Sequence, residues 1–247
     1  MQKLSKAVIV SSILLASASA AQAQWQYNFL VGASAGYGDR SGDYHFTTVT
    51  PAPALAGTTI ARNHSDSGFI WGLLGGFQAH CNSWLFGVET NVDWHDFDDA
   101  RQHQFNRNLG GGVLEAANTV ARYDRGTVVG LTARAGYQMT PYLMPYIRLG
   151  AETSNDEYSV VGAFGPANTP AFAMSEDKRT YRFLGGVGLE VPIPSIQGLS
   201  LRAEYNYHGK GKVVDLGGVA NDNLTFVASN MKPKTHSGKA SVVWNFL

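Results

Sequence analysis

The sequence predicts an all-β fold, an eight-stranded antiparallel up-and-down transmembrane barrel with long external loops. Two observations predict it: apolar and polar residues alternate along eight segments, and the connections between these segments alternate between short and long. A third observation excludes the other way of crossing a membrane. After residue 23, no uninterrupted apolar run approaches the roughly 18 residues that a membrane helix needs.

The N-terminus has the pattern of a secretory signal peptide. Lys3 and Lys6 form a positive region, residues 7–15 are apolar, and Ala21-Gln22-Ala23 is a small-x-small cleavage site. An uncleaved amphipathic helix is the alternative. We expect a signal peptide at 1–23 and one barrel domain at 24–247, exported from the cytoplasm.

The composition excludes several classes of protein. Lys+Arg and Asp+Glu both number 19, so the chain has no basic field that would hold nucleic acid. A single cysteine excludes an intrachain disulfide framework and a cysteine-based zinc cluster. Because aromatic residues make up 11% and charged residues only 15%, the composition also argues against disorder.

The first segment after the signal peptide shows the alternation clearly. From Tyr27 to Tyr37 every second residue is apolar or aromatic, and the residues between them are small or polar except for Leu30. This period of two is typical of a strand with one apolar face. The segments with this pattern are 27–37, 69–78, 84–94, 129–137, 143–152, 181–191, 199–207 and 239–246.

The two faces of these strands differ in a way that indicates lipid outside. The apolar face carries aromatic residues near its ends, as at Tyr27 and Tyr37 or Trp84 and Trp94, which matches the interface girdles of a membrane barrel. The other face carries glycines and charges, whereas a soluble sandwich would turn an apolar face inward. Closure into a barrel satisfies every backbone hydrogen bond in lipid.

The lengths of the connections indicate the orientation. Short periplasmic turns and long external loops are the pattern of outer-membrane barrels, and eight strands with periplasmic termini give three turns and four loops. The short connections are 80–83, 140–142 and 192–198, and the long ones are 39–66, 95–125, 153–179 and 209–235.

In architecture the chain resembles the small eight-stranded outer-membrane β-barrel proteins of Gram-negative bacteria, the surface-antigen-like barrels. It is also similar in plan to the transmembrane domain of outer-membrane protein A. Its C-terminus resembles their assembly signal through Lys239, Ser241, Trp244 and Phe246, although serine replaces the usual glycine and Leu247 follows the last aromatic residue. The resemblance implies the cell outer membrane, with lipid, lipopolysaccharide and the barrel assembly machinery as partners.

Charged residues on the inward face form the most specific candidate site. Counted heights along the strands place Glu89, Arg134, Arg148 and Glu204 in one central layer, with a Glu152–Arg182 pair nearer the outside. Such a network either plugs the lumen, because buried charges need partners, or lines a gated ion path. The full lumen network is Glu89, Arg134, Arg148, Glu152, Arg182, Glu190, Arg202, Glu204 and Lys239.

Other chemistry has weaker support. Residues 93–99 and His103 combine carboxylates with imidazoles, which suits either a divalent cation or a solvated loop. A lipid A deacylase on this scaffold uses a histidine and a serine, but His208 has no serine near it in sequence. The adjacent His236 and Ser237 point to opposite faces. We therefore expect no catalytic, cofactor or metal site.

The sequence thus predicts a structural or surface-interaction protein that displays four long extracellular loops. A narrow channel for ions or small solutes is the first alternative, and a lipid A-modifying enzyme is the second. Binding usually resides in loops on a rigid scaffold, but the pattern does not identify a ligand.

Overall fold

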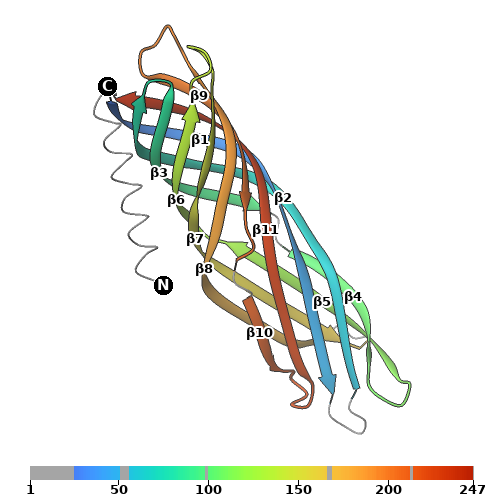
Figure 1. Ribbon diagram of the computed structural model, residues 1–247. Helices are drawn as coiled ribbons and strands as arrows, with labels where there is room; N and C mark the ends of the chain where they lie inside the picture. Colours follow the sequence, from blue (N-terminus) through green and yellow to red (C-terminus); the bar gives the residue numbers. More distant parts are fainter. Residues whose placement is uncertain (1–24, 51–55, 98–99, 166–168, 212–213, 247) are drawn as a thin grey trace, which may run out of the picture.

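The computed structural model describes residues 25–50, 56–97, 100–165, 169–211 and 214–246, which form one long, tilted β-structure (Figure 1). The predicted signal peptide lies outside the described residues. None of the described residues forms a helix that is long and apolar enough to cross a membrane. The strands are β1 (Trp25–Thr50), β2 (Ala56–Cys81), β3 (Trp84–Phe97), β4 (Ala100–Asn108), β5 (Leu114–Arg125), β6 (Val128–Tyr137), β7 (Met144–Phe164), β8 (Thr169–Pro192), β9 (Leu199–His208), β10 (Val214–Val219) and β11 (Phe226–Phe246).

Eight of these strands close into a ring, which confirms the predicted eight-stranded barrel. Each pairs antiparallel with its neighbour in the order β1-β2-β3-β6-β7-β8-β9-β11, and β11 returns to β1 with Phe29 opposite Phe246. Because the ring has no free edge, every strand donates to and accepts from two neighbours. A barrel that crosses lipid needs this closure.

The outer wall of this ring is apolar and its inner wall is polar, as the alternation predicts. Leu131 is 61% exposed, whereas the adjacent Thr132 is 1% exposed and faces the interior. Aromatic pairs strengthen the wall near its rims, where Trp71 stacks on Trp94 at 4.4 Å and Trp84 contacts Tyr137 at 5.0 Å between ring centroids.

The segments predicted as long loops are mostly strands, which corrects that part of the prediction. β1, β2, β7, β8 and β11 run on far past the apolar band, and β4, β5 and β10 lie wholly within the predicted loops. Along the distal part of β1 the apolar face is inverted, since Tyr44 and Phe46 are fully buried while Asp43 and His45 face outward. Water replaces lipid outside the wall there, so apolar side chains turn inward.

The distal strands form a second ring whose two seams lack continuous strand pairing, and we call it the head (residues 39–50, 56–66, 100–125, 155–165, 169–178 and 214–235). In it β4, β5 and β10 take the places of β3, β6 and β9. Individual hydrogen bonds join its two seams. At the seam between β2 and β4, the Arg101 side chain donates to the Ser65 carbonyl at 3.1 Å. At the seam between β8 and β10, the Asn221 N–H, in the turn after β10, donates to the Ala171 carbonyl of β8 at 2.7 Å.

The head has an apolar core of its own. Phe46 stacks on Phe172 at 5.6 Å, and burial raises the pKa of the Tyr44 and Tyr158 phenols, which therefore stay neutral. Each large apolar side chain buried in this way contributes roughly 1.5–3 kcal/mol. The buried core residues are Tyr44, Phe46, Ala121, Tyr123, Tyr158, Val160, Phe172, Leu216, Ala220, Val227 and Met231.

Candidate functional site

The interior of the membrane-spanning ring is filled with paired charges. All nine residues of the predicted lumen network are buried. Five more buried charges join them in the structure. Sequence reasoning missed these because four fall in segments taken for loops and Asp93 was assigned to a cation run. Each of the five lies at an inward position of the alternating pattern, and this was the signal by which the sequence could have identified them. The five additional residues are Arg40, Asp66, Asp93, Arg125 and Asp156.

Four side chains nearest the short turns form a closed group, which we call the charge square: Glu89, Arg134, Glu190 and Arg202. Glu89 Oε1 accepts hydrogen bonds from Arg134 and Arg202, both at 2.9 Å. Glu190 accepts from Arg134 and, at 3.0 Å, from Arg202 Nε. Each charge therefore faces two of opposite sign, and the square is neutral. The Arg134 guanidinium also lies over the Tyr146 ring at 4.2 Å.

The predicted single layer of Glu89, Arg134, Arg148 and Glu204 is wrong. Arg148 and Glu204 form a separate pair at 2.8 Å, and the Tyr146 hydroxyl donates to the same carboxylate at 2.5 Å. Arg134 and Arg148 are direct cross-strand partners, so like charges meet there and each guanidinium turns to a different carboxylate. Because the strands are tilted and staggered, counting residues from the strand ends does not show which side chains lie at the same level of the barrel.

The predicted Glu152–Arg182 ion pair is also wrong, although the two residues are cross-strand partners. Glu152 pairs with Arg125, and Arg182 pairs with Asp156. Burial alone would raise the pKa of the Asp156 carboxyl, but Arg182 and the hydroxyls of Tyr123 and Ser154 hold it below its usual range. Arg125 and Asp156 belong to segments that were predicted as loops. The sequence therefore did not indicate that these two residues compete with Arg182 and Glu152 as ion-pair partners.

The remaining charges complete a neutral column. Lys239 Nζ lies 2.6 Å from Asp93, and Arg40 lies 3.3 Å from Asp66. The Arg40 guanidinium also faces the Phe97 and Tyr123 rings, at 4.6 and 5.0 Å, where the column meets the aromatic core of the head. Among the described residues, seven basic and seven acidic side chains are buried in this column. Arg107, also buried, pairs with Glu115 near the distal tip.

His208 has a serine partner that sequence separation concealed. Its Nε2 lies 3.1 Å from Ser237 Oγ, and its Nδ1 lies 2.8 Å from Glu152. With Glu152 ionised, the geometry fits a neutral imidazole that donates to the carboxylate and accepts from the hydroxyl. This is the order of an acyl-transfer triad. All three residues are nevertheless buried in the column, while His236 faces outward and bonds Tyr205.

The cation alternative for residues 93–99 finds no support in the geometry. Asp93 is engaged by Lys239, His95 stacks on Phe97, and Asp96 faces outward; Asp98 and Asp99 lie outside the described residues. The part of the chain that the structure describes holds no group of three or more His, Cys, Asp or Glu side chains placed to bind a metal.

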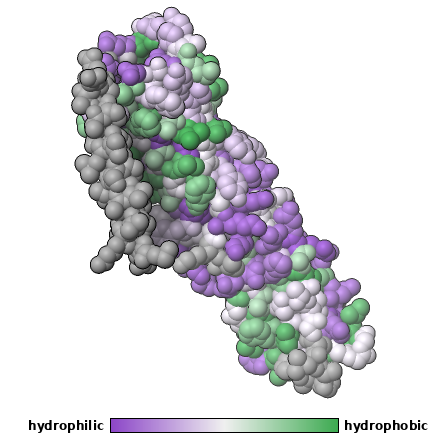
Figure 2. All heavy atoms as spheres, viewed as in Figure 1, coloured by the Kyte–Doolittle hydropathy of each residue, from purple (hydrophilic) through white to green (hydrophobic). Residues whose placement is uncertain are grey.

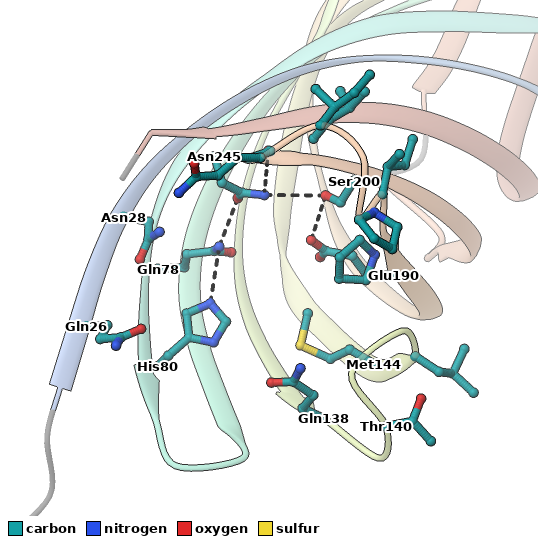
Figure 3. A pocket seen from close by; sticks show the side chains of 18 residues that line it. Gln26, Asn28, Gln78, His80, Gln138, Thr140, Met144, Glu190, Ser200 and Asn245 are labelled. Carbon is teal, nitrogen blue, oxygen red and sulfur yellow. Dashed lines mark hydrogen bonds between the residues drawn. The ribbon is translucent and has the colours of Figure 1, made fainter.

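The end of the barrel that carries the short turns opens into a cavity of about 600 Å³, which we call the mouth (Figure 3). Polar side chains from β1, β2 and β11, such as Asn28, Gln78 and Asn245, line one side. Apolar side chains of the 192–199 turn, with Leu143 and Met144, line the other. Glu190 and Ser200 form its floor, so the mouth ends at the charge square.

The residues of the predicted assembly signal divide between the two faces of β11. Lys239 and Ser241 are buried in the interior, while Trp244 and Phe246 are about half exposed on the outer wall. Leu247 lies outside the described residues.

Comparison with known proteins gives one family. The family model described as outer membrane protein beta-barrel domain matches residues 8–246. No curated protein matches the sequence significantly.

Solved structures with similar chains include other barrels. Ail of Yersinia pestis has 16% identity and a TM-score of 0.30, with 82% of this chain and 98% of Ail covered. OprG of Pseudomonas aeruginosa has 15% identity and a TM-score of 0.45, with 88% and 95% covered. Neisserial surface protein A has 13% identity and a TM-score of 0.30, with 83% and 96% covered.

Proposed function

Because the chain belongs to the outer membrane β-barrel family and lies in the outer membrane, we propose that it serves as a sealed pedestal that presents the head to the cell exterior. The function is structural and surface-interacting. The head is the observation that carries this proposal, since strands that continue beyond the lipid band around an apolar core form a rigid extracellular body.

The distal end of the head has the character of a contact surface. Val219 and Phe226 are cross-strand partners that are 59% and 48% exposed, and Leu224 in the turn between them is also exposed. Figure 2 shows green, hydrophobic surface at this lower end, separated from the membrane band by a purple belt. Exposed apolar groups on a protein surface in water favour an interaction role.

The channel alternative is disfavoured by how the lumen is filled. An ion would have to displace the charge square, the paired column above it and then the apolar core of the head. The charges within this path already neutralise one another in pairs. Opening the path would leave buried charges without partners, at a cost of roughly 3–5 kcal/mol for each broken pair.

Acyl-transfer chemistry is a second candidate, because Ser237, His208 and Glu152 have triad geometry. We interpret the three as a structural network, since Ser237 is 2% exposed and Arg125 occupies the same carboxylate. A serine-reactive fluorophosphonate should leave the folded protein unlabelled. Labelling that disappears in Ser237→Ala, together with a change in lipid A mass on expression, would instead establish an enzyme.

Three further assignments belong to this proposal. Residues 1–23 are removed as a signal peptide, leaving 24–247 as the mature domain. Lys239, Ser241, Trp244 and Phe246 are read by the barrel assembly machinery. Lipopolysaccharide surrounds the outer rim of the apolar band.

The test compares cells that express the protein with cells that express a variant in which residues 100–122 of the β4–β5 hairpin are replaced by a short linker, so that Arg125 still pairs with Glu152. Retention on a panel of immobilised proteins and glycans should depend on the head for at least one surface, and purified protein should not conduct in planar bilayers. Equal retention of both cell types on every surface, combined with steady conductance, would contradict the proposal.

A further inference from the structure

The mouth has the composition of a binding site rather than of a plain turn region. Six carboxamide side chains line it, and carboxamides both donate and accept hydrogen bonds. Its volume of about 600 Å³ falls within the range of small-ligand pockets, about 300–1,000 Å³. The six are Gln26, Asn28, Gln78, Gln138, Gln197 and Asn245.

A hydrogen-bond chain fixes the polar wall, as the dashed lines in Figure 3 show. Gln78 Nε2 donates to Asn245 Oδ1 at 2.9 Å and lies 3.4 Å from His80 Nε2. Asn245 reaches Ser200 at 3.4 Å, and Ser200 donates to Glu190 at 2.7 Å. The wall is therefore anchored to the charge square and is organised before any ligand arrives.

One acceptor in this wall is left over. Asn245 Nδ2 donates to the Gly198 carbonyl at 3.2 Å, so Asn245 Oδ1 is the acceptor for Gln78 and this contact sets the orientation of the Gln78 amide group. Gln78 Oε1 is buried and has no hydrogen-bond partner among the described residues, and the side chain is only 3% exposed. A buried acceptor without a partner costs roughly 1–3 kcal/mol, and a small rotation of the Gln78 side chain toward the cavity lets a ligand N–H recover it.

The charges and the apolar wall narrow the chemistry of the ligand. The nearby guanidinium groups of Arg134 and Arg202 are paired with Glu89 and Glu190, and the described lining of the mouth contains no arginine or lysine that could bind a carboxylate or phosphate. The opposite wall presents Ile193, Ile196 and other aliphatic side chains. Hydroxyl-covered sugars have few apolar atoms to cover such a wall, whereas a peptide carries main-chain amides and aliphatic side chains together.

We infer that the mouth binds a neutral, extended peptide segment from the periplasm. Its main-chain N–H donates to Gln78 Oε1, and its carbonyls accept from the exposed carboxamides of Gln26, Gln138 and Gln197. One aliphatic side chain of the peptide packs on the wall that contains Ile193, Ile196 and Met144. Met144 is unbranched and flexible, so this wall adapts to different aliphatic residues.

The test uses the ¹⁵N-labelled mature protein in lipid nanodiscs and N-acetyl-Ala-Leu-Ala-amide as the probe. Titration should shift the side-chain amide signals of Gln78 and Asn245 saturably. Gln78→Leu should weaken binding about three- to tenfold, as expected for one lost hydrogen bond. Gln138→Leu should also weaken binding. Gln138 is an exposed rim residue, and its backbone N–H holds the turn through Ser83 at 2.7 Å, so the fold should tolerate the change.

Gln102→Leu at the far end of the molecule is the matched control, and it should bind as the wild type does. The same titration with N,N′-diacetylchitobiose and with the uncapped tripeptide should give weaker shifts. The inference is overturned if the capped peptide causes no saturable shift, if the sugar binds as well or better, or if Gln138→Leu binds like Gln102→Leu.

Discussion

Replacing Glu89 with glutamine tests the charge square through its energetic signature. Glu89 Oε1 lies 2.9 Å from both Arg134 and Arg202. At an effective dielectric constant of about 20, each contact at that distance corresponds to about 6 kcal/mol of attraction, which desolvation opposes. The substitution leaves Arg134 and Arg202 sharing Glu190 alone. We expect the free energy of unfolding to fall by about 3–5 kcal/mol.

The double variant provides the specific evidence. Arg134→Gln alone should also destabilise, because it leaves two carboxylates with one guanidinium. Combining it with Glu89→Gln restores neutrality and keeps the Arg202–Glu190 pair, which is 3.0 Å long. The double variant should therefore recover part of the loss, with a coupling energy of roughly 0.5–3 kcal/mol.

Urea titrations of the protein in lipid vesicles measure all four states of this cycle. Glu157→Gln, which removes an exposed carboxylate on the outside of the head, is the control and should change stability by no more than about 0.5 kcal/mol. Strictly additive losses at Glu89 and Arg134 would show that the two do not interact, and the square would have to be abandoned.

Three further predictions concern the wall, assembly and acid stability. Leu131→Lys should cost roughly 2–4 kcal/mol in vesicles, and equal tolerance of Gln102→Lys in the head would show that the outward register is wrong. Phe246→Ala should slow the appearance of the heat-modifiable folded band more than deletion of Leu247 does; the reverse order would make Leu247 the terminal anchor. The folded protein lowers the pKa of Asp156 below its ordinary value of 3.8, so this carboxylate stabilises the fold above about pH 4 and the contribution disappears as pH falls through the lower value. Asp156→Asn should therefore be less stable than wild type at pH 7, with the difference shrinking in acid, and a gap independent of pH would exclude the Arg182 pairing as its source.

The barrel could be predicted because its pattern is long and regular. From Tyr27 to Tyr37, and again from Leu199 to Tyr207, the period of two continues over enough residues to fix both the strand and its outward face. Because lipid surrounds the barrel along this whole span, every outward-facing position is apolar, and the alternation keeps the same phase from one end of the segment to the other.

The head escaped prediction because the apolar face changes sides. On β1 the outward positions are apolar up to Tyr37, but beyond Arg40 the fully buried apolar residues are Tyr44 and Phe46 at inward positions, and Val49 has the outward parity. The same inversion occurs on β7, where Leu149 faces lipid and Tyr158 faces the core of the head. Two apolar positions per strand among polar residues are too few to distinguish from a loop.

The sequence predicted which charged residues lie inside the barrel, but it did not predict which of them pair with one another. Parity alone places Glu89, Arg134 and Glu204 inside, whereas the choice of partner depends on stagger around the ring and on charges such as Arg125 and Asp156 that arrive from the head. His208 and Ser237 show the same limit, since neighbouring strands bring together residues that are 29 positions apart in sequence.

Hydrogen exchange of the backbone amides in lipid nanodiscs tests most directly whether the head is a folded body on a sealed barrel. We predict that amides around Tyr44, Tyr158 and Met231 exchange about as slowly as those around Leu131 in the membrane wall, because both groups lie in paired strands over a filled interior. Exchange of the head amides at the rates of unstructured loops, with protection confined to the membrane wall, would contradict this account.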